Sequence, residues 1–137
     1  MAEVNQNPAS LAQRRPLSPH LQIYRPMLTM MMSITHRITG AALYVGTLLL
    51  AWYLIAAAGD AKSFAAAQSF FGSWFGRIIL FGYTLALFIH LLGGVRHAIW
   101  DSGRGFDAKS REFLAQATLI GGVALTVVVW IFAYIAR

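Results

Sequence analysis

Three long apolar stretches, at residues 28–58, 75–100 and 113–136, constrain this chain more than any other feature. A helix rises about 1.5 Å per residue, so roughly 20 apolar residues cross the hydrocarbon core of a bilayer, and each stretch reaches that length. Because a bilayer offers no water to backbone groups, a spanning segment must satisfy its hydrogen bonds internally, as a helix does. The sequence therefore predicts an all-α integral membrane protein with three transmembrane helices running up, down and up.

Composition supports this class. Of the 137 residues, 58% are hydrophobic and only 12% are charged. The formal net charge is +6, but the basic residues are spread singly along the chain, so we expect no nucleic-acid partner. The absence of cysteine excludes disulfides and thiolate metal sites, which leaves the four histidines as the main candidates for binding a metal.

Residues 1–27 are polar and contain all four prolines, so they are expected to form an N-terminal arm outside the membrane. They contain no apolar core with a cleavage site of the kind found in secretory signal peptides. Residues 28–137 form the predicted transmembrane domain. Between its first two spans, residues 59–74 carry aromatic side chains typical of the headgroup boundary and are expected to include a short interfacial helix.

The distribution of basic residues predicts the orientation of the spans. The positive-inside rule places the arm and the loop after the second span in the cytoplasm, and the C-terminus in the periplasm. On the predicted cytoplasmic side lie Arg14, Arg15, Arg25, Arg104, Lys109 and Arg111, and on the other side Lys62, Arg77 and Arg137.

Ionisable groups inside a span are costly and by default functional. His90 is the deepest of them; His97 lies on nearly the same helix face, and His36 and Arg37 should lie at the depth of His97. A haem b would use a deep neutral imidazole as an axial iron ligand and nearby cations to neutralise its propionates. His90 and His97 stand on one side of such a haem, so the second axial ligand should come from another chain. We also expect the adjacent glycines Gly93 and Gly94 to let the flat macrocycle approach the helix.

Ser33 and Arg37 are one helical turn apart, so a hydroxyl and a guanidinium converge near the cytoplasmic interface. Fixed donors there would stabilise the negative charge that reduction places on quinone oxygens. Simpler interpretations exist for all these residues. His90 would then form only an interhelical hydrogen bond, Ser33 would bond to its own helix, and Arg37 would extend to the headgroups.

Three segments resemble a known family: RPLSPHLQIY at 15–24, SITHRITG at 33–40 and HLLGGVRHAIWD at 90–101. They are similar to the larger, haem-bearing anchor subunit of succinate dehydrogenase, in the form found in mitochondria and their bacterial relatives. The resemblance implies that His90 is an axial haem ligand, that His36, Arg37 and His97 lie near the haem propionates, and that Ser33 and Arg37 help to bind ubiquinone.

The resemblance also implies partners and a location. A second, smaller anchor would supply the other axial histidine and share the haem b. An iron-sulfur subunit, against which the arm would dock through His20 and Tyr24, would bring electrons from a flavoprotein that oxidises succinate. The chain would contribute to quinone reduction without holding the catalytic centre of succinate oxidation. Its place would be the bacterial cytoplasmic membrane, or the mitochondrial inner membrane in a eukaryote.

Three alternatives remain at this stage. The same parts would serve an anchor of a quinol:fumarate reductase, which works in the opposite direction. A haem-free structural or assembly subunit, or a small proton-conducting protein using His36, His90 and His97, would belong to other functional classes.

Overall fold

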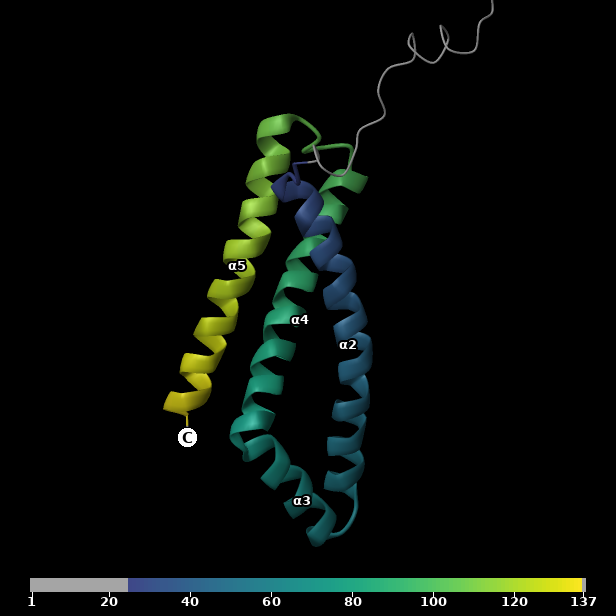
Figure 1. Cartoon of the computed structure of the whole chain (residues 1–137), viewed down its shortest axis with the longest axis vertical. Helices are drawn as coiled ribbons and strands as arrows, with labels where there is room; N and C mark the ends of the chain where they lie inside the picture. Colours follow the sequence, from purple (N-terminus) through teal and green to yellow (C-terminus); the bar gives the residue numbers. More distant parts are fainter. Residues whose placement is uncertain (1–24, 137) are drawn as a thin grey trace, which may run out of the picture.

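The computed structural model describes residues 25–136 and contains three long helices joined by short connections (Figure 1). Helix α2 comprises Leu28–Ala58, α4 comprises Trp74–Asp101, and α5 comprises Ala108–Ile135. All three are long and apolar enough to cross a membrane. The described residues form no strand, so the predicted all-α fold with three membrane helices is confirmed. The N-terminal arm, including His20 and Tyr24, lies outside the described residues apart from 25–27.

The short helix expected between the first two spans is also present. Helix α3, Ala61–Gly72, connects the end of α2 to the start of α4 (Figure 1). Its N-cap is Asp60, whose carboxylate accepts a 2.7 Å hydrogen bond from the Ser63 amide. Because this bond satisfies one of the free N–H groups of the first turn, α3 can begin directly after α2 ends.

The same four-residue sequence, Asp-Ala-Lys-Ser, begins α5. Asp107 accepts a 2.9 Å hydrogen bond from the Ser110 amide, so α5 starts at Ala108, ahead of the apolar stretch predicted from 113. Hydropathy marks the lipid-facing part of a helix, whereas the cap marks where the helix begins. In the preceding loop, Gly103 and Gly105 both have φ of +77°, a conformation that favours glycine.

The helices pack on one another through small residues. A Cβ atom on Gly122 of α5 would lie 2.6 Å from Ile89 Cγ1 of α4. Close approach of backbones at small residues is how membrane helices associate, because lipid offers no hydrophobic driving force between them. Among the described residues, the buried small residues are Thr39, Gly46, Ala56, Ala67, Gly76, Ala86, Gly93, Ala115, Thr118, Gly122 and Thr126.

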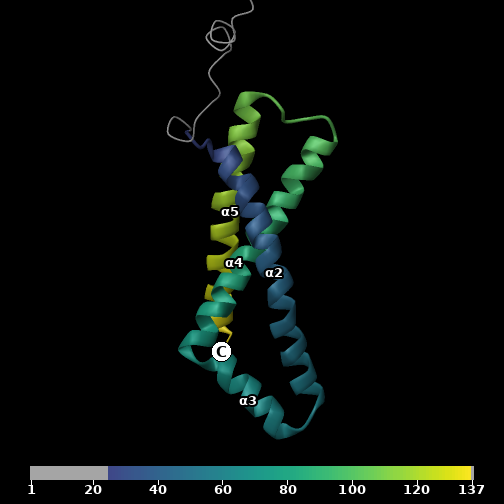
Figure 2. The ribbon, with the colours of Figure 1, turned by 45° about the vertical axis from the view of Figure 1, so that its right-hand side comes forward.

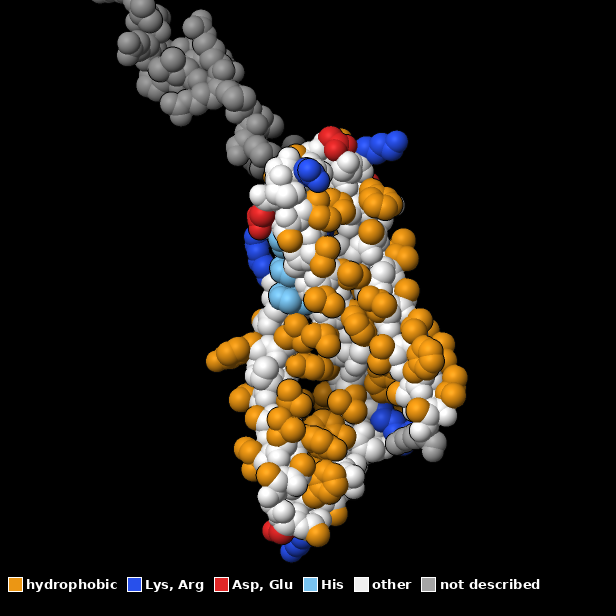
Figure 3. All heavy atoms as spheres, turned by 180° about the vertical axis from the view of Figure 1, so that it is seen from behind, with side chains coloured by type: hydrophobic (Ala, Val, Ile, Leu, Met, Phe, Trp, Pro, Cys, Tyr) orange, Lys and Arg blue, Asp and Glu red, His pale blue; other side chains and the backbone are white. Residues whose placement is uncertain are grey.

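Most large apolar side chains point away from the other helices of the chain. Figure 3 shows them along the length of one face, with acidic and basic side chains mainly near its two ends. In water such a surface would be unstable, so it must be covered by lipid or by helices of other subunits.

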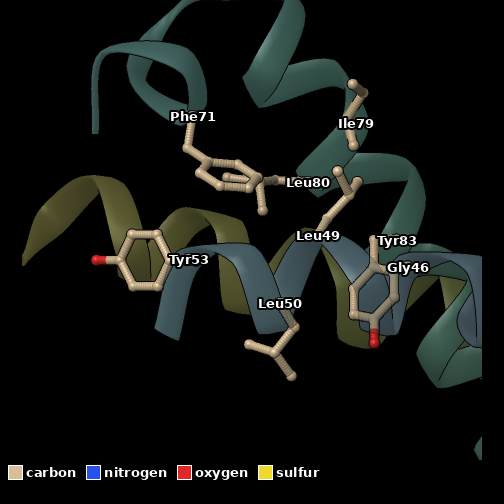
Figure 4. Close-up of a pocket in the computed structure, with 8 residues that line it drawn as sticks. All are labelled: Gly46, Leu49, Leu50, Tyr53, Phe71, Ile79, Leu80 and Tyr83. Atoms are coloured by element: carbon tan, nitrogen blue, oxygen red, sulfur yellow. The ribbon is translucent and has the colours of Figure 1, made fainter. Parts of the chain in front are cut away.

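Helix α2 crosses α4 near the end that carries the α4–α5 loop, and the two diverge toward α3 (Figures 1 and 2). Beyond the crossing they leave an apolar cavity of about 300 Å³ (Figure 4). It is lined by Gly46, Leu49, Leu50, Tyr53, Phe71, Ile79, Leu80 and Tyr83.

The stability that the Asp107 cap gives to the start of α5 should depend on pH. Hydrogen bonds from the Ser110 side chain and amide hold the pKa of the Asp107 carboxyl below its usual range. A lowered folded-state pKa means that the carboxylate stabilises the helix start above its unfolded pKa, and that this contribution is lost as pH falls through the folded pKa. Asp107→Ala should speed hydrogen exchange of the Ser110 amide at neutral pH, whereas Asp107→Asn, which keeps an acceptor, should change it little. Equal exchange in the wild type and Asp107→Ala would contradict the cap.

Candidate functional site

Three histidines meet where α2 crosses α4, and we call His36, His90 and His97 the imidazole cluster. The rings of His36 and His90 stack with centroids 4.0 Å apart and an angle of 4° between their planes. The ring of His97 is tilted by 55° to that of His36, with centroids 5.1 Å apart. The predicted common depth of His36 and His97 is therefore confirmed, and Figure 3 shows the histidine side chains gathered in one place.

Two glycines allow the stacked rings to fit between the helices. A Cβ on Gly40 of α2 would lie 3.0 Å from Cε1 of His90, and a Cβ on Gly93 of α4 would overlap Nδ1 of His36. Each helix thus offers a glycine to the histidine of the other. This exchange lets two imidazole rings occupy a contact that would otherwise hold only small side chains.

The backbone of α2 determines which nitrogen of His90 is free. Nδ1 of His90 lies 3.1 Å from the carbonyl oxygen of His36 and 3.3 Å from the hydroxyl of Thr39. Since a carbonyl only accepts, Nδ1 carries the proton and donates it there. In the neutral ring the lone pair is then on Nε2, the arrangement that orients and strengthens a histidine as a metal ligand.

The two glycines of the Gly93–Gly94 pair have different roles, which corrects the prediction that both admit a macrocycle. Gly93 is buried, and the His36 ring fills the space beside it, so this glycine allows the contact between α2 and α4. A Cβ on Gly94 would meet no atom within 4 Å. Of these two glycines, Gly94 is therefore the one that leaves open space for a flat group to approach α4.

Arg96 is the most completely buried charged residue of the described region, with 1% of its surface exposed. Its guanidinium carbon lies 5.1 Å from the centre of the Trp100 ring. Nε, Nη1 and Nη2 have no hydrogen-bond partner, and residues 25–136 contain no salt bridge. A buried cation without an anion is costly, so it makes this end of the helices favourable for a negatively charged group.

Ser33 and Arg37 stand one turn apart on α2, as the sequence predicts, but the two side chains differ in their exposure. Arg37 is exposed and Ser33 is half-buried. Within the described range the Ser33 hydroxyl forms no hydrogen bond, unlike Thr35, whose hydroxyl donates to the Met31 carbonyl at 2.9 Å. The simpler interpretation, in which Ser33 bonds to its own helix, does not hold here.

Sequence reasoning missed three parts of this site. It did not find the stacking of His36 on His90, the carbonyl that accepts from His90, or the burial of Arg96. The positions of Gly40 and Gly93 carried a usable signal, because each lies about one turn after a histidine and so shares its helix face. No pattern in the sequence shows that Arg96 points inward while Arg37 points outward.

Comparison with known proteins places these features in a family. A family model described as succinate dehydrogenase/fumarate reductase transmembrane subunit matches residues 12–133. A succinate dehydrogenase cytochrome b556 subunit of Paracoccus denitrificans is 42% identical over 135 residues, which cover 98% of this chain and 99% of the relative. A cytochrome b556 subunit of Rickettsia conorii is 36% identical and covers 86% and 92%. The mitochondrial cytochrome b560 subunit of Sus scrofa is also 36% identical and covers 88% and 69%.

The glycine exchange makes a testable prediction about packing. Gly93→Val should force His36 or the helices apart and lower stability by about 1–3 kcal/mol, as overpacking of a filled contact does. Gly94→Val adds the same side chain where there is open space and should cost less than about 0.5 kcal/mol. Thermal unfolding of the detergent-purified protein would measure both. Equal losses in the two variants would show that α2 and α4 do not meet at Gly93.

Proposed function

Because this chain belongs to the succinate dehydrogenase/fumarate reductase transmembrane subunit family, we propose that it is the cytochrome b anchor of a succinate:ubiquinone oxidoreductase. Its near full-length similarity to subunits named cytochrome b556 of succinate dehydrogenase favours succinate oxidation over fumarate reduction as the reaction of the complex. The observation that carries the proposal is the hydrogen bond from His90 Nδ1 to the His36 carbonyl.

His90 is the proposed axial ligand of a haem b. Its Nε2 is left with a lone pair, its ring is held between Gly40 and His36, and the neighbouring surface at Gly94 is open. These features fit a haem, which when bound carries one electron at a time. The role of α2 is to hold the His90 ring in one tautomer and one orientation.

The remaining polar groups suit the propionates. His36, His97 and Arg37 lie at the same end of the helices and supply N–H donors, and the uncompensated charge of Arg96 favours anions in their vicinity. Arg96 itself is closed off by its own chain, so it acts through its field and through packing on Trp100.

Among the histidines of residues 25–136, only His90 is proposed for the iron, because His36 and His97 are proposed for the propionates. Both belong to the same cluster as His90, since the His36 ring contacts the rings of His90 and His97. The second anchor subunit would therefore supply the other axial histidine and share the haem, and the exposed apolar faces provide a surface on which it can pack.

Ser33 and Arg37 are the proposed ubiquinone ligands. The Ser33 hydroxyl is not used within the described chain, and the exposed Arg37 guanidinium stands one turn away. As electrons reach the quinone, these donors stabilise the charge on its oxygens, and their place near the membrane surface lets protons arrive from water. Electrons would come from the flavoprotein through the iron-sulfur subunit, which we place on this side, facing the cytoplasm.

The haem proposal is tested by the visible spectrum of the assembled complex. His90→Ala removes the ligand, so the reduced-minus-oxidised b-type bands should be lost. His97→Asn keeps a polar group beside the site, so it should retain the bands. A redox titration of these bands measures the reduction potential of the haem in this variant. Unchanged bands in His90→Ala would rule out ligation by this residue.

The quinone proposal is tested by two assays of the same complex. Arg37→Ala should lower quinone reduction by about a hundredfold, since it removes a charged donor, and Ser33→Ala by about tenfold. Succinate oxidation with an artificial acceptor at the flavoprotein should be unchanged. Thr35→Val is the control, because its hydroxyl is already bonded to its own helix. Normal quinone turnover in both Ser33→Ala and Arg37→Ala would refute the site.

A further inference from the structure

A second polar site lies at the opposite end of α4, far from the imidazole cluster. Arg77 is in the first turns of α4, and Arg96 is near its end. At the helical rise these positions are separated by roughly 28 Å, close to the thickness of the hydrocarbon core. Arg77 therefore lies at the other membrane boundary from the proposed haem and quinone residues.

Arg77 lines a groove between α4 and α5 whose lining also includes Phe71 of α3. The groove has a volume of about 330 Å³, in the range of ligand sites. It is lined by Phe71, Arg77, Leu80, Thr84, Val129, Trp130, Ala133 and Tyr134. Apart from Arg77, Thr84 and the polar tips of the aromatic residues, this lining is apolar. A ligand that fits it must have a long apolar part and a single polar end.

The positive charge of Arg77 would be stabilised by an anionic ligand. The side chain is half-buried, its Nε is buried without a hydrogen-bond partner, and residues 25–136 provide no ion pair for it. The first turn of a helix is itself positive, so a cation there is unfavourable unless an anion binds beside it. A guanidinium with free N–H groups suits the oxygens of a phosphate.

The aromatic residues of the groove are arranged for a lipid at a headgroup boundary. The Trp130 indole N–H donates to the Thr84 hydroxyl at 3.4 Å, which fixes the ring as one wall of the groove. Tyr134 is 57% exposed, its ring centroid is 6.3 Å from that of Trp130, and its hydroxyl has no partner within the described residues. Trp and Tyr are the residues that favour the membrane interface.

We propose that this groove binds an anionic phospholipid, with the phosphate on Arg77 and one acyl chain between α4 and α5 toward Thr84 and Val129. The apolar lining favours a phospholipid over free phosphate, because free phosphate would contact only the guanidinium of Arg77 and none of the apolar side chains. The proposal is independent of haem and quinone, because it uses none of the residues assigned to them.

The test uses the assembled complex in nanodiscs with equal amounts of phosphatidylglycerol and phosphatidylcholine. A photoreactive benzoylphenylalanine at Ala133, which lines the groove, would be activated by light, and the mass of this subunit would identify what it captured. We expect phosphatidylglycerol adducts to exceed phosphatidylcholine adducts about fivefold, as one cation near a membrane surface allows. The same probe at Val128, which is exposed outside the groove, should show no such preference.

Two charge variants complete the test. Arg77→Gln should reduce the preference to about one, whereas Lys62→Gln, which removes a charge from α3 outside the groove, should leave it at fivefold. An equal preference in the wild type and Arg77→Gln would overturn the proposal. So would capture of another protein subunit at Ala133, which would mean that a partner helix covers the groove. Loss of the preference on adding inorganic phosphate would assign the site to the free anion instead.

Discussion

The exchange of a histidine and a glycine between α2 and α4 is the contact on which the rest of the site depends. Gly40 receives the His90 ring and Gly93 receives the His36 ring, so two imidazoles stack where the backbones are close. The close approach also brings the His36 carbonyl within hydrogen-bond distance of His90. The same crossing therefore determines the packing of α2 on α4 and the tautomer of His90. A larger residue at Gly40 or Gly93 would disturb both.

This crossing also explains how polar groups are tolerated inside an apolar protein. Membrane helices gain little from apolar contact with one another, and small residues and hydrogen bonds must hold them together. Three buried threonine hydroxyls donate hydrogen bonds to backbone carbonyls of their own helices, which offsets the cost of burying them. These residues are Thr39, Thr118 and Thr126. Arg96 is the exception, because its side-chain nitrogens have no hydrogen-bond partner among residues 25–136. The contact of its guanidinium with the Trp100 ring offsets part of this cost.

Much of the architecture was predictable from the sequence, because lipid imposes a simple rule on length and polarity. The first span was predicted at the bounds that the helix has, and the second to within one residue. Helix α5 begins five residues before the predicted third span at 113, since the cap at Asp107 extends the helix through polar residues that hydropathy excludes. Within the site, spacing predicted the shared depth of His36 and His97 but assigned Gly93 to the wrong neighbour. The side chain that fills the space beside a glycine depends on how two helices cross. The periodicity along one helix carries no information about that crossing.

By itself, the sequence determined that the chain is a three-span membrane protein, and its motifs indicated the family and the polar residues proposed to form the site, because apolar length and residue type are local properties. Only the tertiary structure decided how those residues act together. It orients the His90 ring through a carbonyl 54 positions away, buries Arg96 while leaving Arg37 exposed, and forms the groove at Arg77 from side chains of α3, α4 and α5. Each of these depends on the angle and distance between helices, which arise from the packing of side chains on separate segments.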